Sequence, residues 1–204
     1  MKKIALSLAT VLTLSSVVIA SDTTSQVKND NGLYLGLGYG YLDGSIDAGS
    51  ISTDIDTNNV VIQGGFKINK YVSLEARYWT GLDNGDATQS GGNYPGSYNA
   101  NKTWAWGAYI KPTYPIFTNV NVYGLLGYGV SSLKYNGNSI NSDDFSWGLG
   151  GEFVLNKNIA FYADYISITS QNSADFTYAP SGYTTSTNSN TDVYTMNIGI
   201  TYKF

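Results

Sequence analysis

The stretch DVYTMNIGITYKF at positions 192–204 alternates apolar residues with polar or small ones from Tyr194 to Phe204. A period of two residues is typical of a β-strand whose two faces meet different surroundings. The apolar set is Tyr194, Met196, Ile198, Ile200, Tyr202 and Phe204. The stretch exceeds the ~9–11 residues with which a tilted strand crosses a bilayer, so it predicts a membrane-spanning β-strand.

Seven further segments upstream show the same alternation, which gives eight predicted strands. They cover about 32–43, 57–67, 71–81, 103–114, 119–134, 144–155 and 158–168. The fifth is the least regular, because Tyr123 and Leu125 fall on its polar face.

The predicted connections alternate in length along the chain. The odd ones are long or intermediate (44–56, 82–102, 135–143, 169–191) and the even ones short (68–70, 115–118, 156–157). This rhythm is typical of an up-and-down barrel with tight periplasmic turns, long extracellular loops and both termini in the periplasm. The sequence therefore predicts an all-β, membrane-spanning, eight-stranded antiparallel barrel over 32–204. In hydrocarbon every backbone group needs a partner, so the first strand must pair with the last.

The direction of the apolar face separates this barrel from a soluble ligand-binding barrel, whose apolar face points inward. The opposite face is rich in Gly and Ser and nearly free of charge, which suits a narrow lumen better than a water-exposed surface. Aromatic residues recur near the segment ends, as expected for interfacial girdles. Those expected at the extracellular interface are Tyr39, Tyr41, Tyr78, Trp104, Trp106, Tyr128 and Tyr194.

The first residues and the composition indicate export. Lys2 and Lys3 precede the apolar run 4–20, which ends on Val-Ile-Ala, as in a cleaved signal peptide. We expect a signal peptide over 1–20 and a short periplasmic segment over 21–31; an uncleaved membrane anchor is the alternative. Only 13% of residues are charged and the net charge is −4, which disfavours nucleic acid as a partner.

The terminal pattern Met196, Ile198, Ile200, Tyr202 and Phe204 resembles the C-terminal insertion signal of bacterial outer-membrane proteins. Over 32–204 the chain is similar to the small barrels of the OmpA-transmembrane, OmpX and opacity-protein type. The resemblance implies the outer membrane as location, with its lipids, lipopolysaccharide and insertion machinery as partners, and a monomer. We expect no peptidoglycan-binding domain of the kind found in full-length OmpA proteins, so the resemblance does not imply a cell-wall tether.

Five charged residues fall on inward-facing strand positions at similar heights. They are Glu75, Arg77, Lys111, Glu152 and Asp164. Buried charges need partners, so we expect one ion network in the lumen. It fits a static plug; the alternative is a gate in which Arg77 and Lys111 exchange acidic partners and open a narrow path for ions or small solutes.

An enzyme is not expected, because the chain has neither His nor Cys and no recognisable nucleophile and base. Neither a cofactor nor a metal is expected. The favoured function is a structural or cell-surface interaction role, with a host, phage or matrix ligand at the loops.

The predicted loops carry two candidate contact groups. Their acidic group is Asp43, Asp47, Asp54, Asp56, Asp83, Asp86, Asp143, Asp144, Asp175 and Asp192. Their aromatic group is Tyr94, Tyr98, Phe176, Tyr178 and Tyr183. A solvated acidic surface is the simpler interpretation; carboxylates that share divalent cations with lipopolysaccharide are the alternative.

Overall fold

The computed structural model describes residues 31–48, 51–82, 85–90, 96–135, 138–171, 174–178, 183–187 and 190–204. The predicted signal peptide and nearly all of the segment 21–31 lie outside these residues. The strands are β1 Gly32–Ala48, β2 Ile51–Asn69, β3 Val72–Gly81, β4 Asp86–Ser90, β5 Gly96–Phe117, β6 Val120–Tyr135, β7 Asn138–Val154, β8 Ile159–Gln171, β9 Ala174–Tyr178, β10 Tyr183–Thr187 and β11 Asn190–Lys203.

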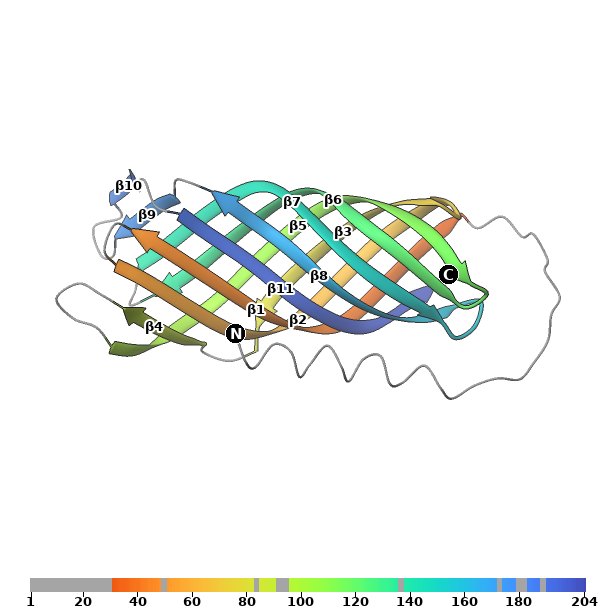
Figure 1. Ribbon diagram of the computed structural model, residues 1–204, viewed down its shortest axis with the longest axis horizontal. Coiled ribbons are helices and arrows are strands. Elements are labelled where there is room, and N and C mark those ends of the chain that lie inside the picture. The colour runs from red at the N-terminus through yellow and green to blue at the C-terminus, as the bar shows by residue number, and fades with distance from the viewer. Residues whose placement is uncertain are drawn as a thin grey trace.

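Eight long strands close into one antiparallel barrel (Figure 1). Around the ring the order is β1, β2, β3, β5, β6, β7, β8, β11 and back to β1. The closing pair aligns Leu37 with Ile200 and Tyr39 with Ile198. The predicted closure of the first strand on the last is confirmed. The described part of the chain contains no helix long and apolar enough to cross a membrane.

The two ends of the barrel differ. At one end, here called the turn end, the strands join through short turns, and Gly32 and Phe204 lie there together. The Asn69 side chain accepts the backbone N–H groups of Tyr71 and Val72 at 2.8 and 3.0 Å, and this tightens the β2–β3 turn. The opposite end, here called the hairpin end, carries the long strand extensions together with β4, β9 and β10 (Figure 1).

The hairpin end corrects the prediction of long solvated loops, because most of those residues form strands. β1 and β2 pair as far as Ala48 and Ile51. β4 pairs with β2 and β5, β9 pairs with β7, and β10 pairs with β9. The physical reason is that period-two alternation continues beyond position 43: Leu42 and Ile46 point inward while Asp43 and Asp47 lie on the other face.

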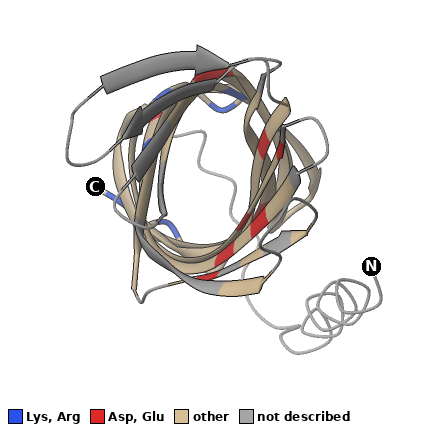
Figure 2. Ribbon diagram, turned by 90° about the vertical axis from the view of Figure 1, so that its left-hand side faces the viewer, with Lys and Arg blue, Asp and Glu red and all other residues tan. Residues whose placement is uncertain are grey.

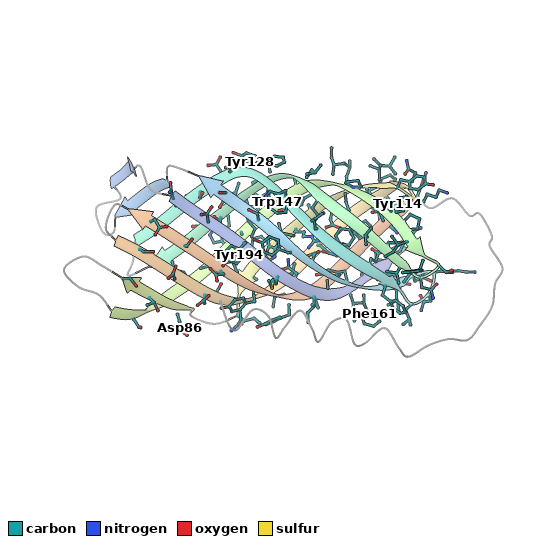
Figure 3. The ribbon with its side chains drawn as sticks, in the orientation of Figure 1. Asp86, Tyr114, Tyr128, Trp147, Phe161 and Tyr194 are labelled. Atoms are coloured by element: carbon teal, nitrogen blue, oxygen red, sulfur yellow. The ribbon has the colours of Figure 1, made fainter. Side chains whose placement is uncertain are left out.

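The outer surface of the barrel is apolar, as the alternation predicted. Leu37 is 62% exposed, Leu149 63% and Ile198 52%. Side chains stand out from the wall along its length (Figure 3). In water such a surface would be an aggregation hazard, whereas a membrane barrel presents it to lipid.

The inward face departs from the prediction of small and polar residues, because it also carries large apolar ones. The buried inward set includes Leu42, Ile46, Ile55, Val61, Trp79, Leu125, Ile166, Ile168 and Val193. The lumen is therefore a packed core rather than a polar tube.

Candidate functional site

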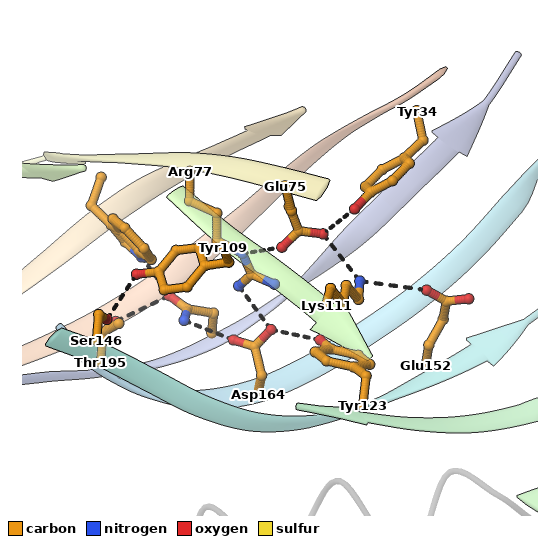
Figure 4. A network of polar contacts seen from close by, with 12 residues as sticks. Tyr34, Glu75, Arg77, Tyr109, Lys111, Tyr123, Ser146, Glu152, Asp164 and Thr195 are labelled. Carbon is orange, nitrogen blue, oxygen red and sulfur yellow. Dashed lines mark hydrogen bonds and ion pairs between the residues drawn. The ribbon is translucent and has the colours of Figure 1, made fainter. Parts of the chain in front are cut away.

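The structure brings the five predicted lumen charges together as a chain of ion pairs (Figure 4). Arg77 Nε lies 2.6 Å from Glu75 Oε1, and Arg77 Nη1 lies 2.8 Å from Asp164 Oδ2. Lys111 Nζ lies 3.1 Å from Glu75 Oε2 and 3.8 Å from Glu152 Oε2. The side chains of Glu75, Arg77 and Asp164 are completely buried, so each depends on its partners to offset the cost of leaving water.

A sixth charge that the sequence analysis missed balances the network. Lys67 Nζ lies 3.9 Å from Glu152 Oε1, so three cations face three carboxylates. A signal was present, because Lys67 follows Val61, Gln63 and Gly65 in the inward phase of β2. The described ion-pair network therefore carries no excess of acidic groups.

Hydrogen bonds from aromatic and amide side chains complete the charged layer. The Tyr34 hydroxyl donates to Glu75 at 2.5 Å, and the Tyr123 hydroxyl donates to Asp164 at 2.6 Å. The Asn197 amide donates to the other Asp164 oxygen at 2.8 Å. Both carboxylates are thus held from several strands at once, which fixes their positions.

Two glycines make room for these tyrosine rings. A Cβ atom at Gly65 would collide with the Tyr34 ring, and one at Gly150 would collide with the Tyr123 ring. The absence of a side chain at Gly65 and Gly150 therefore lets the rings of Tyr34 and Tyr123 pack against the inner wall.

An apolar layer lies next to the charged layer, toward the hairpin end. Leu42, Val61, Leu125 and Ile166 are at most 1% exposed and form part of one cluster with Trp79. The Trp79 indole N–H donates to Asn197 Oδ1 at 2.9 Å and so connects the two layers. The sequence signal was the presence of Tyr123 and Leu125 on the polar face of their segment.

The arrangement fills this part of the lumen, and the described residues around it form no recognisable pair of nucleophile and base. No group of three His, Cys, Asp or Glu side chains suited to a metal ion occurs among the described residues. The lumen carboxylates are held by Arg, Lys and Tyr, and an ion that left the charged layer toward the hairpin end would next meet the large apolar side chains of Trp79 and Leu125, which cannot solvate it.

The predicted outer aromatic residues lie on the outer face toward the hairpin end. Tyr39, Tyr41, Tyr78, Trp106 and Tyr128 are exposed, whereas Trp104 and Tyr194 are half-buried. Figure 3 shows Tyr128, Trp147 and Tyr194 along this part of the wall. The sequence analysis missed Trp147 and Tyr165, whose rings are 6.1 Å apart and continue the belt to Tyr194.

Acidic residues lie directly beyond this belt. The Tyr41 hydroxyl donates to Asp56 at 2.7 Å, and the Tyr128 hydroxyl donates to Asp143. The backbone register sets Asp43 opposite Asp56, and Asp56 opposite Asp86, in one row across β1, β2 and β4. Figure 2, which looks along the barrel from the hairpin end, shows acidic segments around this rim.

Partial burial and neighbouring carboxylates affect the protonation of Asp43. Partial burial, with the nearby Asp56 and Asp54 carboxylates, raises the pKa of Asp43, while the hydrogen bond from Tyr194 partly opposes the rise. Like charges directly opposite one another in a sheet are destabilising, so the row is electrostatically strained at neutral pH.

The predicted insertion signal faces outward on β11. Ile198, Ile200, Tyr202 and Phe204 are exposed and Met196 is half-buried. Tyr202 and Phe204 meet edge to face with ring centroids 5.1 Å apart.

The loop aromatics cannot be placed in this way. Tyr94 and Asp83 lie outside the described residues. For Tyr98, Phe176, Tyr178, Tyr183 and Asp175 the strands describe only the backbone.

The family assignment follows from a sequence model that agrees with this architecture. The model of the outer membrane protein beta-barrel domain matches residues 7–204. The chain belongs to this outer-membrane β-barrel family. No curated protein matches this family member by sequence.

Solved structures support the same fold. OprG from Pseudomonas aeruginosa is 13% identical with a TM-score of 0.61, over 86% of this chain and 97% of OprG. Ail, the attachment invasion locus protein of Yersinia pestis, is 14% identical with a TM-score of 0.50, over 85% and 99%. Neisserial surface protein A is 15% identical with a TM-score of 0.52, over 85% and 97%. At these identities the likeness establishes the barrel fold alone.

Proposed function

We propose that this outer-membrane barrel is a sealed, non-catalytic structural protein that acts through its hairpin end at the cell surface. In this orientation the turn end faces the periplasm and the strand extensions project from the cell. An even number of strands, joined by short turns at one end, favours this orientation.

The observation that carries the proposal is the filled lumen. A charged layer with six paired charges is followed by an apolar layer, so the interior serves stability. An eight-stranded barrel has just enough interior for its own side chains. What remains for function is the part of the wall that projects beyond the aromatic belt.

The chemistry of the outer wall restricts the partner. Seven described carboxylates face outward on this wall, namely Asp43, Asp47, Asp54, Asp56, Asp86, Asp143 and Asp192, whereas the side chains of Lys102 and Lys134 are not described. One structure of Ail contains a heparin analogue. For the present chain an acidic wall favours a cationic or uncharged partner over a sulfated polyanion.

A shortened hairpin end tests this proposal. β8 and β11 align Gln171 with Thr191, so replacement of residues 172–190 by Asn-Gly makes a two-residue turn of the preferred type. Bacteria that display wild-type barrel should bind host cells or matrix more strongly than bacteria without it. The shortened barrel, which lacks β9 and β10 but keeps the acidic wall, should bind them less strongly than the wild type.

The matched control leaves the hairpins intact and changes only the lumen, as in Lys111→Gln. It should retain surface binding. Equal binding by the wild-type and shortened barrels would contradict the proposal.

A gated channel is the second candidate, and one observation favours it. Lys111 lies between Glu75 and Glu152, so a small movement could exchange its partners. The apolar layer weighs against conduction, since it would also have to open.

Recognition of β11 by the insertion machinery is a further part of the proposal. The alternating outward set from Met196 to Phe204 supports it, because this pattern is accessible along the outer face of the last strand.

A further inference from the structure

A hollow of about 1060 Å³ lies against the outer wall of the barrel across β1, β2, β3, β5 and β6. Its floor is a row of small outward-facing residues, because Gly64 aligns with Ala76, and Ala76 aligns with Ala108. The same row ends in larger residues on both sides, Leu35 and Tyr128. The hollow is thus a depression in a surface that elsewhere carries Leu, Ile and aromatic side chains.

The floor of the hollow lies at the membrane depth that the end of a lipid acyl chain reaches. Lys70, in the β2–β3 turn, lies six positions after Gly64, which is about 20 Å along a strand. A strand tilt of ~40° reduces this to a depth of about 15 Å, half the ~30 Å hydrocarbon core. The floor therefore lies near the middle of the bilayer, an acyl chain's length from the turn end.

Lys70, in the turn that joins β2 and β3, lies where a lipid head group would be. Lys70 is exposed, and its Nζ lies 4.7 Å from the centroid of the Tyr71 ring. Lys67, Lys157 and Lys203 lie at the same end, and no exposed carboxylate side chain accompanies them in the described part of the chain. The turn end is therefore basic where the hairpin end is acidic.

We propose that this hollow and Lys70 form a binding site for one anionic phospholipid of the leaflet that faces the turn end. The phosphate lies at Lys70 beside Tyr71, and an acyl chain runs past Phe66 and Leu74 to the floor at Ala76. Basic residues at the membrane surface select anionic head groups. Only the choice of leaflet rests on the orientation proposed above; cell-surface binding is a separate matter.

The test is lipid retention measured by native mass spectrometry, with purified barrel titrated separately with phosphatidylglycerol, phosphatidylcholine and lipid A. The double variant A76L/A108L fills the hollow with side chains that suit a lipid-facing wall. Lys70→Gln removes the head-group contact. We expect each to weaken phosphatidylglycerol binding, the filled variant by about tenfold.

Matched controls occupy the other side of the barrel. Ala163 faces outward on β8, away from the hollow, and Lys157 is exposed in the β7–β8 turn. The Ala163→Leu and Lys157→Gln variants should bind phosphatidylglycerol with an affinity within twofold of wild type. Lys70→Arg, which keeps the positive charge, should retain the binding that Lys70→Gln loses. Heat-dependent gel mobility shows whether each variant is folded.

Four results would overturn the proposal. They are unchanged phosphatidylglycerol binding by folded A76L/A108L, equal binding of phosphatidylcholine by wild type, stronger binding of lipid A, and a wild-type dimer that A76L/A108L abolishes. The last would assign the hollow to a second copy of the chain. Neither reduced nor equal cell-surface binding in the hairpin test would change any of these four results.

Discussion

Arg77 on β3 and Asp164 on β8 join opposite walls of the barrel through an ion pair of 2.8 Å. The two strands are four places apart in a ring of eight, so the contact crosses the full lumen. Arg77 also holds Glu75 at 2.6 Å. One guanidinium thus ties two carboxylates, with the hydrogen bonds from Tyr34 and Tyr123, into a single cross-brace.

Replacement of Arg77 should strongly destabilise the barrel. Arg77→Met keeps most of the volume but leaves Glu75 and Asp164 buried without their cation, so we expect the free energy of unfolding to fall by about 3–5 kcal/mol. Urea titration of the refolded barrel in micelles, followed by Trp fluorescence, measures this.

Arg77→Lys serves as the control, because it keeps the charge but cannot reach both carboxylates with a planar fork. It should be intermediate. A loss below about 1 kcal/mol for Arg77→Met would show that the cross-brace contributes little.

The packing of Tyr123 against Gly150 predicts that alanine substitutions at Gly150 and Gly151 have different effects on stability. A Cβ at Gly150 would meet the Tyr123 ring, whereas the nearest atom to one at Gly151 is Asn121 O at 3.8 Å. We expect Gly150→Ala to destabilise the barrel by about 1–3 kcal/mol, as overpacking does, and Gly151→Ala to change it by at most ~0.5 kcal/mol. Equal effects of the two substitutions in urea titration would contradict the packing described here.

The acidic row predicts a pH dependence. Because the pKa of Asp43 is raised in the folded barrel, the folded state holds the Asp43 proton more tightly than the unfolded state. Asp43 therefore lowers stability at neutral pH, and this penalty disappears as the pH falls through the raised pKa. Asp43→Asn should stabilise the barrel at pH 7.5 and have a smaller effect near pH 4.

Urea midpoints of wild type and Asp43→Asn at both pH values measure this difference. Asp47→Asn, on the same face of β1, is the control, because the register sets Asp47 opposite Ser52 and Asn190 and not opposite a carboxylate. A larger gain for Asp43→Asn at pH 4 than at pH 7.5 would reverse the expected sign and refute the account of the row.

Much of the barrel was predictable because a membrane imposes period two on every strand. The segment 192–204 showed its outward and inward faces directly, and its pairing with β1 followed from the need to satisfy edge groups in hydrocarbon. The five lumen charges could be predicted as a group from phase and height. Their individual partners could not, because shear sets which heights meet, and Arg77 pairs with Asp164 from the opposite wall.

The strand extensions and the inward apolar layer were both missed because the composition around them is polar or small. Composition in the region 44–56 is polar and rich in Asp and Ser, which resembles a loop, yet Ile46 and Ile55 keep the inward phase and extend the strands. The apolar layer was hidden similarly, since Tyr123 and Leu125 looked like irregularities in a face otherwise lined by small or polar residues. Only their convergence in the closed barrel shows that they form a layer.

The most direct test of the sealed lumen is ion conductance in planar bilayers. Wild-type barrel and Glu75→Ala, which disrupts the charged layer, should both show no steady current, because the apolar layer still separates the two ends. A variant that combines Glu75→Ala with Leu42→Ser and Leu125→Ser should conduct. Steady current through wild type, or current that appears with Glu75→Ala alone, would contradict the sealed barrel and favour the gated channel.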